Sequence, residues 1–145
     1  MNATKTPKEK AQFALRDLRW DDYTQLNNIC GQVKQEMIRP HGFGVPKGIV
    51  AMNGKEVVGG LVYKAEAGGN AVLDAIVVAK EWQGKDVGKH LMGEFLKRMA
   101  ALDVREIRTR PKNMDAAAYF ERHGFTIDES AKGLAMVSRR VQKKE

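Results

Sequence analysis

The chain of 145 residues has almost no cysteine and no long hydrophobic segment. Cys30 is its only cysteine, which excludes a disulfide within the chain and a zinc site built on several thiolates. This cysteine usage fits a reducing, cytoplasmic compartment. No apolar run is long enough to span a bilayer, and the first ten residues, MNATKTPKEK, lack the apolar core of a secretory signal. We therefore expect a soluble, cytoplasmic protein that has no membrane partner.

Aromatic residues are also scarce, at 7% of the chain, and acidic residues (18) are outnumbered by Lys and Arg (25), giving a net charge of +7. Part of this excess lies near the two ends. A second basic group surrounds residues 83–92 and consists of Lys80, Lys85, Lys89, Arg105, Arg108, Arg110 and Lys112. A basic surface attracts polyanions, so nucleic-acid binding is one hypothesis. The shortage of aromatic side chains for base stacking favours a phosphorylated small molecule instead.

The length and the apolar share of 43% suit a single domain with one core. We expect a polar basic leader over residues 1–12, one domain over residues 13–141 and a charged tail over residues 142–145. Hydrophobic periodicity predicts the order strand, helix, two strands, strand, helix, strand, helix, two strands. Such an order is typical of an α/β fold in which helices cover a mixed sheet.

Two helices are predicted by apolar residues at three- and four-residue steps. The first has Leu26, Ile29, Cys30, Val33 and Met37 on its buried face. Asp21 and Asp22 are both candidates for its cap, and Pro40 marks its end. The second carries Val87, Leu91, Phe95 and Met99.

Turn residues separate the remaining elements. Asn53 and Gly54 join residues 49–52 to residues 57–63 in a predicted hairpin, because this dipeptide readily adopts positive φ angles. A third helix over residues 115–123 is expected to end at Gly124.

Residues 83–92, QGKDVGKHLM, follow a strand-like run and open the second helix. The N–H groups of a first helical turn have no partner within the helix, and together with the helix dipole they attract phosphate. This spacing resembles the Gln/Arg-x-x-Gly-x-Gly/Ala signature of the Gcn5-related N-acetyltransferases (GNAT), in which the loop holds the pyrophosphate of acetyl-coenzyme A (acetyl-CoA). Asp86 stands where the first glycine of that signature is expected, so its Cβ restricts the backbone and its carboxylate repels phosphate.

The resemblance extends from about Phe13 to about Val141 through three ordered blocks. IVAMNGKEVVGGLVY is similar to the second and third strands of the family, and LDAIVVAKEWQGKDVGKHLM to its fourth strand, loop and helix. NMDAAAYFERHGF is similar to its Asn-containing helix with an aromatic pair and a Gly-Phe. The resemblance implies a GNAT-like mixed, mostly antiparallel central sheet flanked by helices.

The family also implies roles for particular residues. The backbone of Ile76, Val77 and Val78 would pair with the pantetheine arm, although these residues also suit a core strand. Asn113 would contact the pantetheine amides, and it also suits a helix cap. The pyrophosphate would face the loop residues, which are Gln83, Gly84, Lys85, Val87, Gly88 and Lys89.

The catalytic candidates are Asp74 and Tyr119. Asp74 lies on the proposed fourth strand, on the same face as Ile76, and can accept an amine proton through water; the alternative is a structural Asp bonded to its neighbours. Many family members have a tyrosine that protonates the leaving thiolate, and here Phe120 occupies that position and joins the coenzyme-binding residues. Tyr119 is its neighbour, about a quarter-turn away on the helix. No group of residues has metal-ligand spacing.

The leading hypothesis is an acetyl-CoA-dependent N-acyltransferase that transfers acetyl directly to an amine in a ternary complex. The acceptor is a small molecule or a protein. A second hypothesis is a catalytically inactive GNAT-like binding or structural subunit of a larger assembly, such as a viral particle. Pairing of edge strands into a homodimer also suits this fold.

Overall fold

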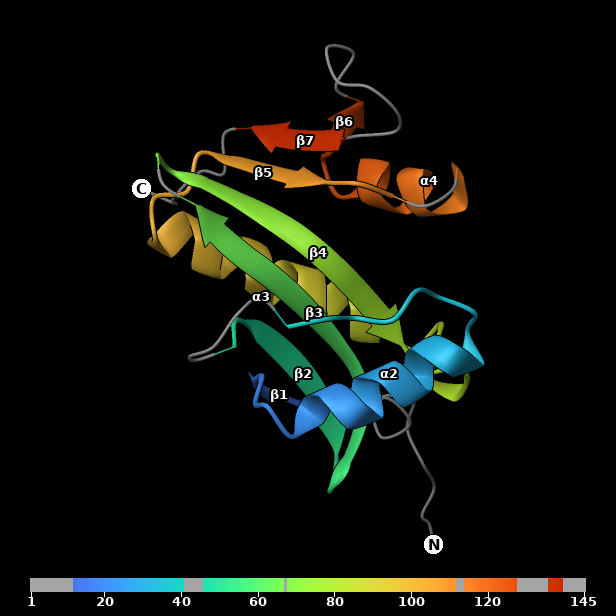
Figure 1. Cartoon of the computed structure of the whole chain (residues 1–145). Coiled ribbons are helices and arrows are strands. Elements are labelled where there is room, and N and C mark those ends of the chain that lie inside the picture. Colours follow the sequence, from blue (N-terminus) through green and yellow to red (C-terminus); the bar gives the residue numbers. More distant parts are fainter. Residues whose placement is uncertain (1–11, 41–45, 67, 112–113, 128–135, 140–145) are drawn as a thin grey trace, which may run out of the picture. The chain divides into compact units, whose positions relative to one another are not determined.

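The computed structural model describes residues 12–40, 46–66, 68–111 and 114–127 and the backbone of residues 136–139. Its elements follow the predicted order (Figure 1), and the mixed, mostly antiparallel α/β class is confirmed. They are β1 (Ala14–Asp17), α2 (Asp22–Gln32), β2 (Gly48–Asn53), β3 (Glu56–Glu66), β4 (Asn70–Val78), a 3-10 turn η1 (Lys80–Trp82), α3 (Val87–Ala101), β5 (Glu106–Thr109), α4 (Met114–Arg122), β6 (Thr126–Ile127) and β7 (Met136–Arg139). No helix among these residues is long and apolar enough to cross a membrane.

The chain divides into two compact units. The first comprises Met1–Val62 and Ala75–Leu91, and the second comprises Tyr63–Asp74 and Met92–Glu145. Strands β3 and β4 and helix α3 each run from one unit into the other. The predicted leader and tail fall almost entirely outside the described residues, so their boundaries stay predictions.

In the first unit, β1, β2 and β3 form an antiparallel sheet. Ala14 pairs with Met52, and Ile49 pairs with Leu61. The predicted hairpin is confirmed, since β2 ends at Asn53, β3 begins at Glu56 and Gly54 has a φ of 63°.

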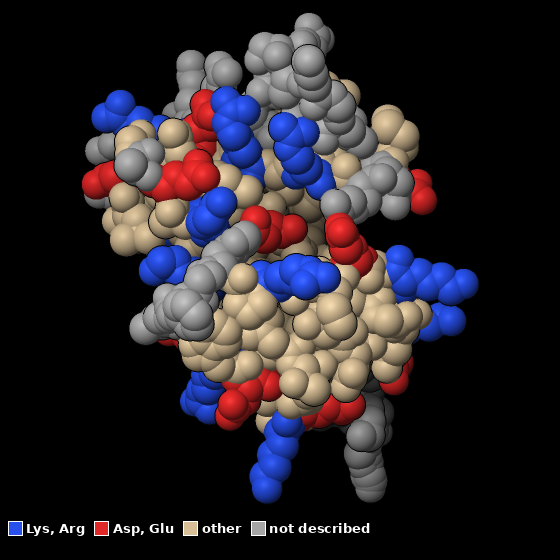
Figure 2. Space-filling model, viewed as in Figure 1, with Lys and Arg blue, Asp and Glu red and all other residues tan. Residues whose placement is uncertain are grey.

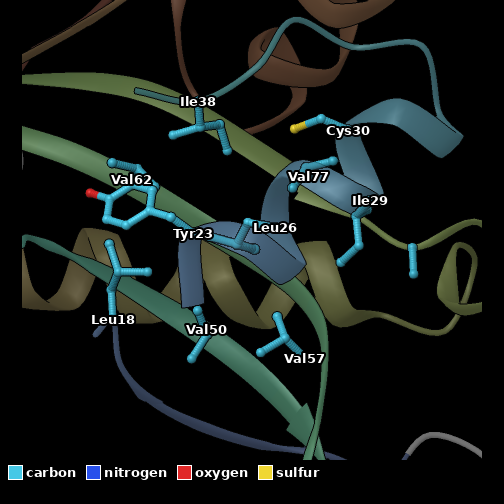
Figure 3. Close-up of a cluster of buried hydrophobic side chains, with 11 residues drawn as sticks. Leu18, Tyr23, Leu26, Ile29, Cys30, Ile38, Val50, Val57, Val62 and Val77 are labelled. Atoms are coloured by element: carbon cyan, nitrogen blue, oxygen red, sulfur yellow. The ribbon is translucent and has the colours of Figure 1, made fainter. Parts of the chain in front are cut away.

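Two adjacent glycines let helices approach opposite faces of this sheet. A Cβ on Gly60 would lie 2.6 Å from Cδ2 of Leu26 on α2, and a Cβ on Gly59 would lie 3.2 Å from Cγ1 of Val87 on α3. Neighbouring strand residues point to opposite faces, so α2 covers one face and the start of α3 the other. The α2 side holds a hydrophobic cluster (Figure 3) of Leu18, Tyr23, Leu26, Ile29, Cys30, Ile38, Val50, Val57, Val62, Val77 and Ala79.

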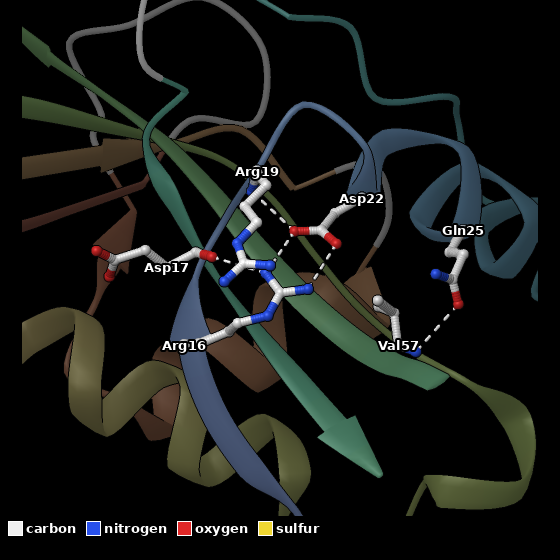
Figure 4. A network of polar contacts seen from close by, with 6 residues as sticks. All are labelled: Arg16, Asp17, Arg19, Asp22, Gln25 and Val57. Atoms are coloured by element: carbon white, nitrogen blue, oxygen red, sulfur yellow. Dashed lines mark hydrogen bonds and ion pairs between the residues drawn. The ribbon is translucent and has the colours of Figure 1, made fainter. Parts of the chain in front are cut away.

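Of the two residues predicted to cap α2, Asp22 rather than Asp21 bonds to the backbone at the start of the helix, and it also forms an ion pair with Arg16. Asp21 makes no side-chain cap hydrogen bond. The buried Asp22 carboxylate instead accepts hydrogen bonds from both terminal nitrogens of Arg16, at 2.8 and 2.9 Å, and from the Arg19 backbone N–H at 2.7 Å (Figure 4). Burial opposes ionisation of Asp22, but these bonds and the charges of Arg16 and Arg19 outweigh it and lower the pKa of Asp22.

The end of α2 differs from the prediction. The helix stops at Gln32, well before Pro40, and Met37 is 60% exposed rather than buried. The cause is a left-handed residue: Lys34 has a φ of 58°, and the next N–H, from Gln35, bonds to the Cys30 carbonyl at 2.8 Å. This Schellman arrangement satisfies the last carbonyls of the helix and turns the chain away.

In the second unit, β4 pairs in parallel with β5, from Asn70 with Glu106 to Leu73 with Thr109. Strand β7 pairs antiparallel with β5 and with β6. Helix α3 packs here through Phe95, whose ring centroid lies 5.2 Å from that of Tyr63.

Helix α4 also belongs to the second unit. Its last residue is Arg122, and Gly124, the residue predicted to terminate it, follows with a φ of 94°.

Candidate functional site

The loop between β4 and α3 has the backbone of a glycine-rich turn although it contains a single glycine before the helix. Gly84 has a φ of 80° and Asp86 a φ of 70°. Aspartate is among the few non-glycine residues that tolerate this left-handed region. Asp86 therefore adopts a conformation suited to the glycine that it replaces. The helix begins at the next residue, Val87.

The first turn of α3 holds the Asp86 carbonyl in place. This oxygen accepts a hydrogen bond from the His90 backbone N–H at 3.0 Å, and His90 Nδ1 lies 2.8 Å from it. A carbonyl oxygen can only accept, so Nδ1 carries the proton, and in the neutral ring Nε2 is the acceptor. These two contacts from one residue hold the peptide group between Asp86 and Val87 at the start of α3.

An aromatic group lies beside this loop. Lys85 Nζ is 5.3 Å from the ring centroid of Trp82, a cation–π distance. Phe13 meets Trp82 edge-on at 6.3 Å and His90 edge-on at 5.3 Å. The ring contact holds the Lys85 charge over Trp82, and Lys85 lies two residues before the first turn of α3, where the helix dipole favours an anion.

Two side-chain amides donate hydrogen bonds to backbone carbonyls at the end of β4. Gln83 Nε2 donates to the Val78 carbonyl at 3.1 Å, and Gln35 Nε2 donates to the Ile76 carbonyl at 3.3 Å. Between them, Val77 is 3% exposed and belongs to the hydrophobic cluster. Gln83 was a predicted site residue, whereas Gln35 was not. Nothing in the sequence marks Gln35, because its partner lies 41 residues away.

The remaining predicted residues belong to the second unit. Asp74 is exposed on β4. Tyr119 is half-buried, with its ring 4.8 Å from that of His123, and burial raises the pKa of its phenol against an opposing effect of the Arg122 charge. Phe120 is buried on α4 against Phe125, with ring centroids 5.5 Å apart. Tyr119 and Phe120 therefore differ in burial as neighbours on a helix do.

The structure brings the loop residues and the end of β4 together in the first unit, and these are Ile76, Val77, Val78, Gln83, Gly84, Lys85, Val87, Gly88 and Lys89. Asn113 lies outside the described residues. Within the described ranges, no group of three His, Cys, Asp or Glu residues is placed to hold a metal ion. Figure 2 shows Asp and Glu side chains among Lys and Arg side chains on the visible face. The visible charge is mixed rather than uniformly basic.

Three solved structures of similar fold are described as acetyltransferases. The PaiA N-acetyltransferase of Thermoplasma acidophilum, in complex with coenzyme A, is 15% identical, with a TM-score of 0.69 over 88% of this chain and 99% of that one. A GNAT acetyltransferase of Staphylococcus aureus Mu50 is 12% identical, with a TM-score of 0.73 over 88% and 99% of the chains. The ribosomal-protein-S18-alanine N-acetyltransferase of Escherichia coli is 14% identical, with a TM-score of 0.68 over 92% and 97%.

Sequence comparison gives the family. No curated protein sequence matches the chain. The model of the acetyltransferase (GNAT) family matches residues 13–125, which is most of the chain and includes β4, the loop and α4. The chain therefore belongs to the acetyltransferase (GNAT) family, whose co-substrate is acetyl-CoA.

Proposed function

We propose that this protein transfers the acetyl group of acetyl-CoA directly to an amine held beside it in a ternary complex. The observation that carries the proposal is the backbone of the loop after β4. Gly84 and Asp86 are both left-handed, and α3 follows at once. A turn of this kind directs the first amides of a helix to one place, where they and the helix dipole favour a phosphate.

Coenzyme binding in this proposal uses mainly the backbone. The pantetheine arm lies along the end of β4 at Ile76, Val77 and Val78. The pyrophosphate sits on the loop and first helical turn, from Gln83 to Lys89. Lys85, held over Trp82 at 5.3 Å, adds positive charge there. The family resemblance also assigns Asn113 and Phe120 to coenzyme binding.

The chemistry requires one bond to form and one to break. The neutral amine attacks the thioester carbonyl, the N–C bond forms, the C–S bond breaks, and coenzyme A leaves as a thiolate. Asp74 receives the proton of the amine through water, and Tyr119 gives a proton to the thiolate. The phenol of Tyr119 is protonated at neutral pH, as a donor must be; burial raises its pKa and so makes it a weaker acid than an exposed tyrosine.

Titration calorimetry with acetyl-CoA tests the binding step. We expect Lys85→Ala to weaken binding by about 2- to 5-fold, the usual effect of one charge near a helix terminus. Lys55, exposed in the turn between β2 and β3, provides the matched control Lys55→Ala, which should bind as the parent protein does. Absence of binding at near-millimolar acetyl-CoA would refute the proposal.

Turnover distinguishes an enzyme from an inactive relative. Release of free coenzyme A thiol is followed with a panel of small amines and peptide N-termini. Acceptor-dependent release supports transfer by direct attack, and a covalent acetyl-protein found by mass spectrometry without acceptor would contradict it. Tight binding with no release for any acceptor would favour the non-catalytic subunit.

A further inference from the structure

Gln35 makes a contact that belongs to neither a helix nor a strand ladder. Its carboxamide Nε2 donates to the Ile76 carbonyl at 3.3 Å. Gln35 lies in the segment that follows α2, drawn in cyan in Figure 1, where this segment runs across the end of β4. Both residues belong to the first unit. The contact therefore joins the segment after α2 to the strand end that the proposed function assigns to the pantetheine arm.

The backbone on both sides of Gln35 is fixed. Its own N–H bonds to the Cys30 carbonyl at 2.8 Å in the Schellman arrangement at the end of α2. Three residues later, the Asn27 side chain accepts from the Ile38 N–H at 2.7 Å and donates to the Ile38 carbonyl at 3.0 Å. Because hydrogen bonds fix the backbone on both sides of Gln35, its side chain is held at one position beside β4.

The Ile76 carbonyl lies on the edge of β4 that faces away from β3. Ala79 donates its N–H to the Val58 carbonyl of β3 at 2.9 Å, and backbone groups alternate sides along an extended chain, so those of Ile76 and Val78 face the other way. Among the described residues, β5 pairs with β4 only from Asn70 to Leu73. Beyond Leu73, at Ile76, the side-chain amide of Gln35 donates the hydrogen bond that a neighbouring strand would otherwise supply.

We propose that Gln35 is a positioning residue that closes this edge in the free protein and is displaced by the pantetheine arm. The inference rests on the proposed function. A chain paired with a strand edge lies about 4.8 Å from it. The Gln35 nitrogen, 3.3 Å from the Ile76 oxygen, already lies within that space. The arm and the carboxamide therefore exclude each other.

Titration calorimetry with acetyl-CoA on the full chain tests this inference. Gln35→Met keeps the length of the side chain and removes the donor, and Gln35→Ala removes both. Both variants should bind acetyl-CoA about 2- to 10-fold more tightly, because one competing hydrogen bond is absent. Gln32→Ala, exposed at the end of α2, is the matched control and should leave the affinity unchanged. Thermal unfolding of each variant accompanies the titrations.

The direction of the change separates the explanations. Tighter binding with an unchanged or lowered melting temperature supports displacement, since general damage to the fold would weaken binding. Unchanged or weaker binding in a folded Gln35→Met protein overturns it, and weaker binding would mean that Gln35 contacts the coenzyme. If no protein binds acetyl-CoA, including the parent, both this inference and the proposed function fail.

Discussion

Asp86 offers the sharpest test of how this loop works, because one residue combines an unusual backbone conformation with a negative charge. Three variants separate the effect of the backbone conformation from the effect of the charge. Asp86→Asn removes the charge and keeps a side chain that tolerates a φ of 70°, Asp86→Gly removes both charge and Cβ, and Asp86→Ala leaves a Cβ without a polar group.

The conformational effect appears in stability. The left-handed region costs an ordinary L-residue about 1–2 kcal/mol, whereas glycine adopts it freely but loses about 0.5–1 kcal/mol through its flexible unfolded chain. Urea unfolding should therefore place Asp86→Ala about 1 kcal/mol below Asp86→Asn, and Asp86→Gly close to the parent protein. Equal stability of the Ala and Asn variants would refute the claim that the backbone angle limits this position.

The electrostatic effect appears in coenzyme affinity. At about 7 Å in water, a carboxylate and one phosphate charge repel by about 0.6 kcal/mol, and a pyrophosphate carries more than one charge. Calorimetry at low salt should show both Asp86→Asn and Asp86→Gly binding acetyl-CoA about 3- to 8-fold more tightly, with a smaller gain at physiological salt. A gain for Gly alone would assign the effect to the backbone, and no gain for either would refute phosphate repulsion.

Three further predictions concern the core and the chemistry. Arg16→Ala should lower the free energy of unfolding by about 2–4 kcal/mol at pH 7, because it leaves the buried Asp22 carboxylate without its guanidinium bonds. Because the pKa of Asp22 is lowered in the folded protein, this stabilisation is present above about pH 4 and is lost as the pH falls through the folded-state pKa. Arg16→Ala should therefore lose less stability than the parent protein on acidification. Parallel curves of unfolding free energy against pH for the two proteins would contradict this role of the ion pair. Gly60→Ala places a Cβ 2.6 Å from a Leu26 methyl group and should lower the free energy of unfolding in urea by about 1–3 kcal/mol. Gly93→Ala, in open space on α3, should raise it by about 0.5–1 kcal/mol. The reverse order would show that α2 can move to accommodate the added methyl group. Tyr119→Phe should lower kcat by about 10-fold or more with little change in acetyl-CoA affinity, and an unchanged kcat would remove Tyr119 as the acid.

The order of elements could be predicted because each depends on local periodicity. Val87, Leu91, Phe95 and Met99 follow helical spacing, and all are at most 1% exposed. The same reasoning failed at Met37, where the apolar spacing continues but the helix does not. The helix ends through a left-handed lysine, and a lysine carries no sequence signal for that conformation.

The loop of the candidate site could be predicted from the sequence because its strand, turn and helix follow one another along the chain. The contact between Gln35 and Ile76 could not be predicted from the sequence. It depends on where the end of α2 directs the chain and on which edge of β4 faces it. Glutamine has neither the periodicity of a core residue nor the spacing of a motif, so only the fold could place it.

The left-handed residues show why the Asp86 substitution can be compatible with function. Lys34, Asp86 and Asp103 all have φ angles between 58° and 70°, and Lys34 and Asp103 both follow the end of a helix, whose last carbonyls are satisfied by the turn. Asp86 precedes a helix, and its carbonyl is held by His90 from the first turn. In each case hydrogen bonds surround a residue that adopts an angle more easily reached by glycine. The proposed binding of phosphate requires this conformation rather than a glycine, so the missing glycine alone is no argument against coenzyme binding. The charge of the Asp86 carboxylate is the feature that the variants test.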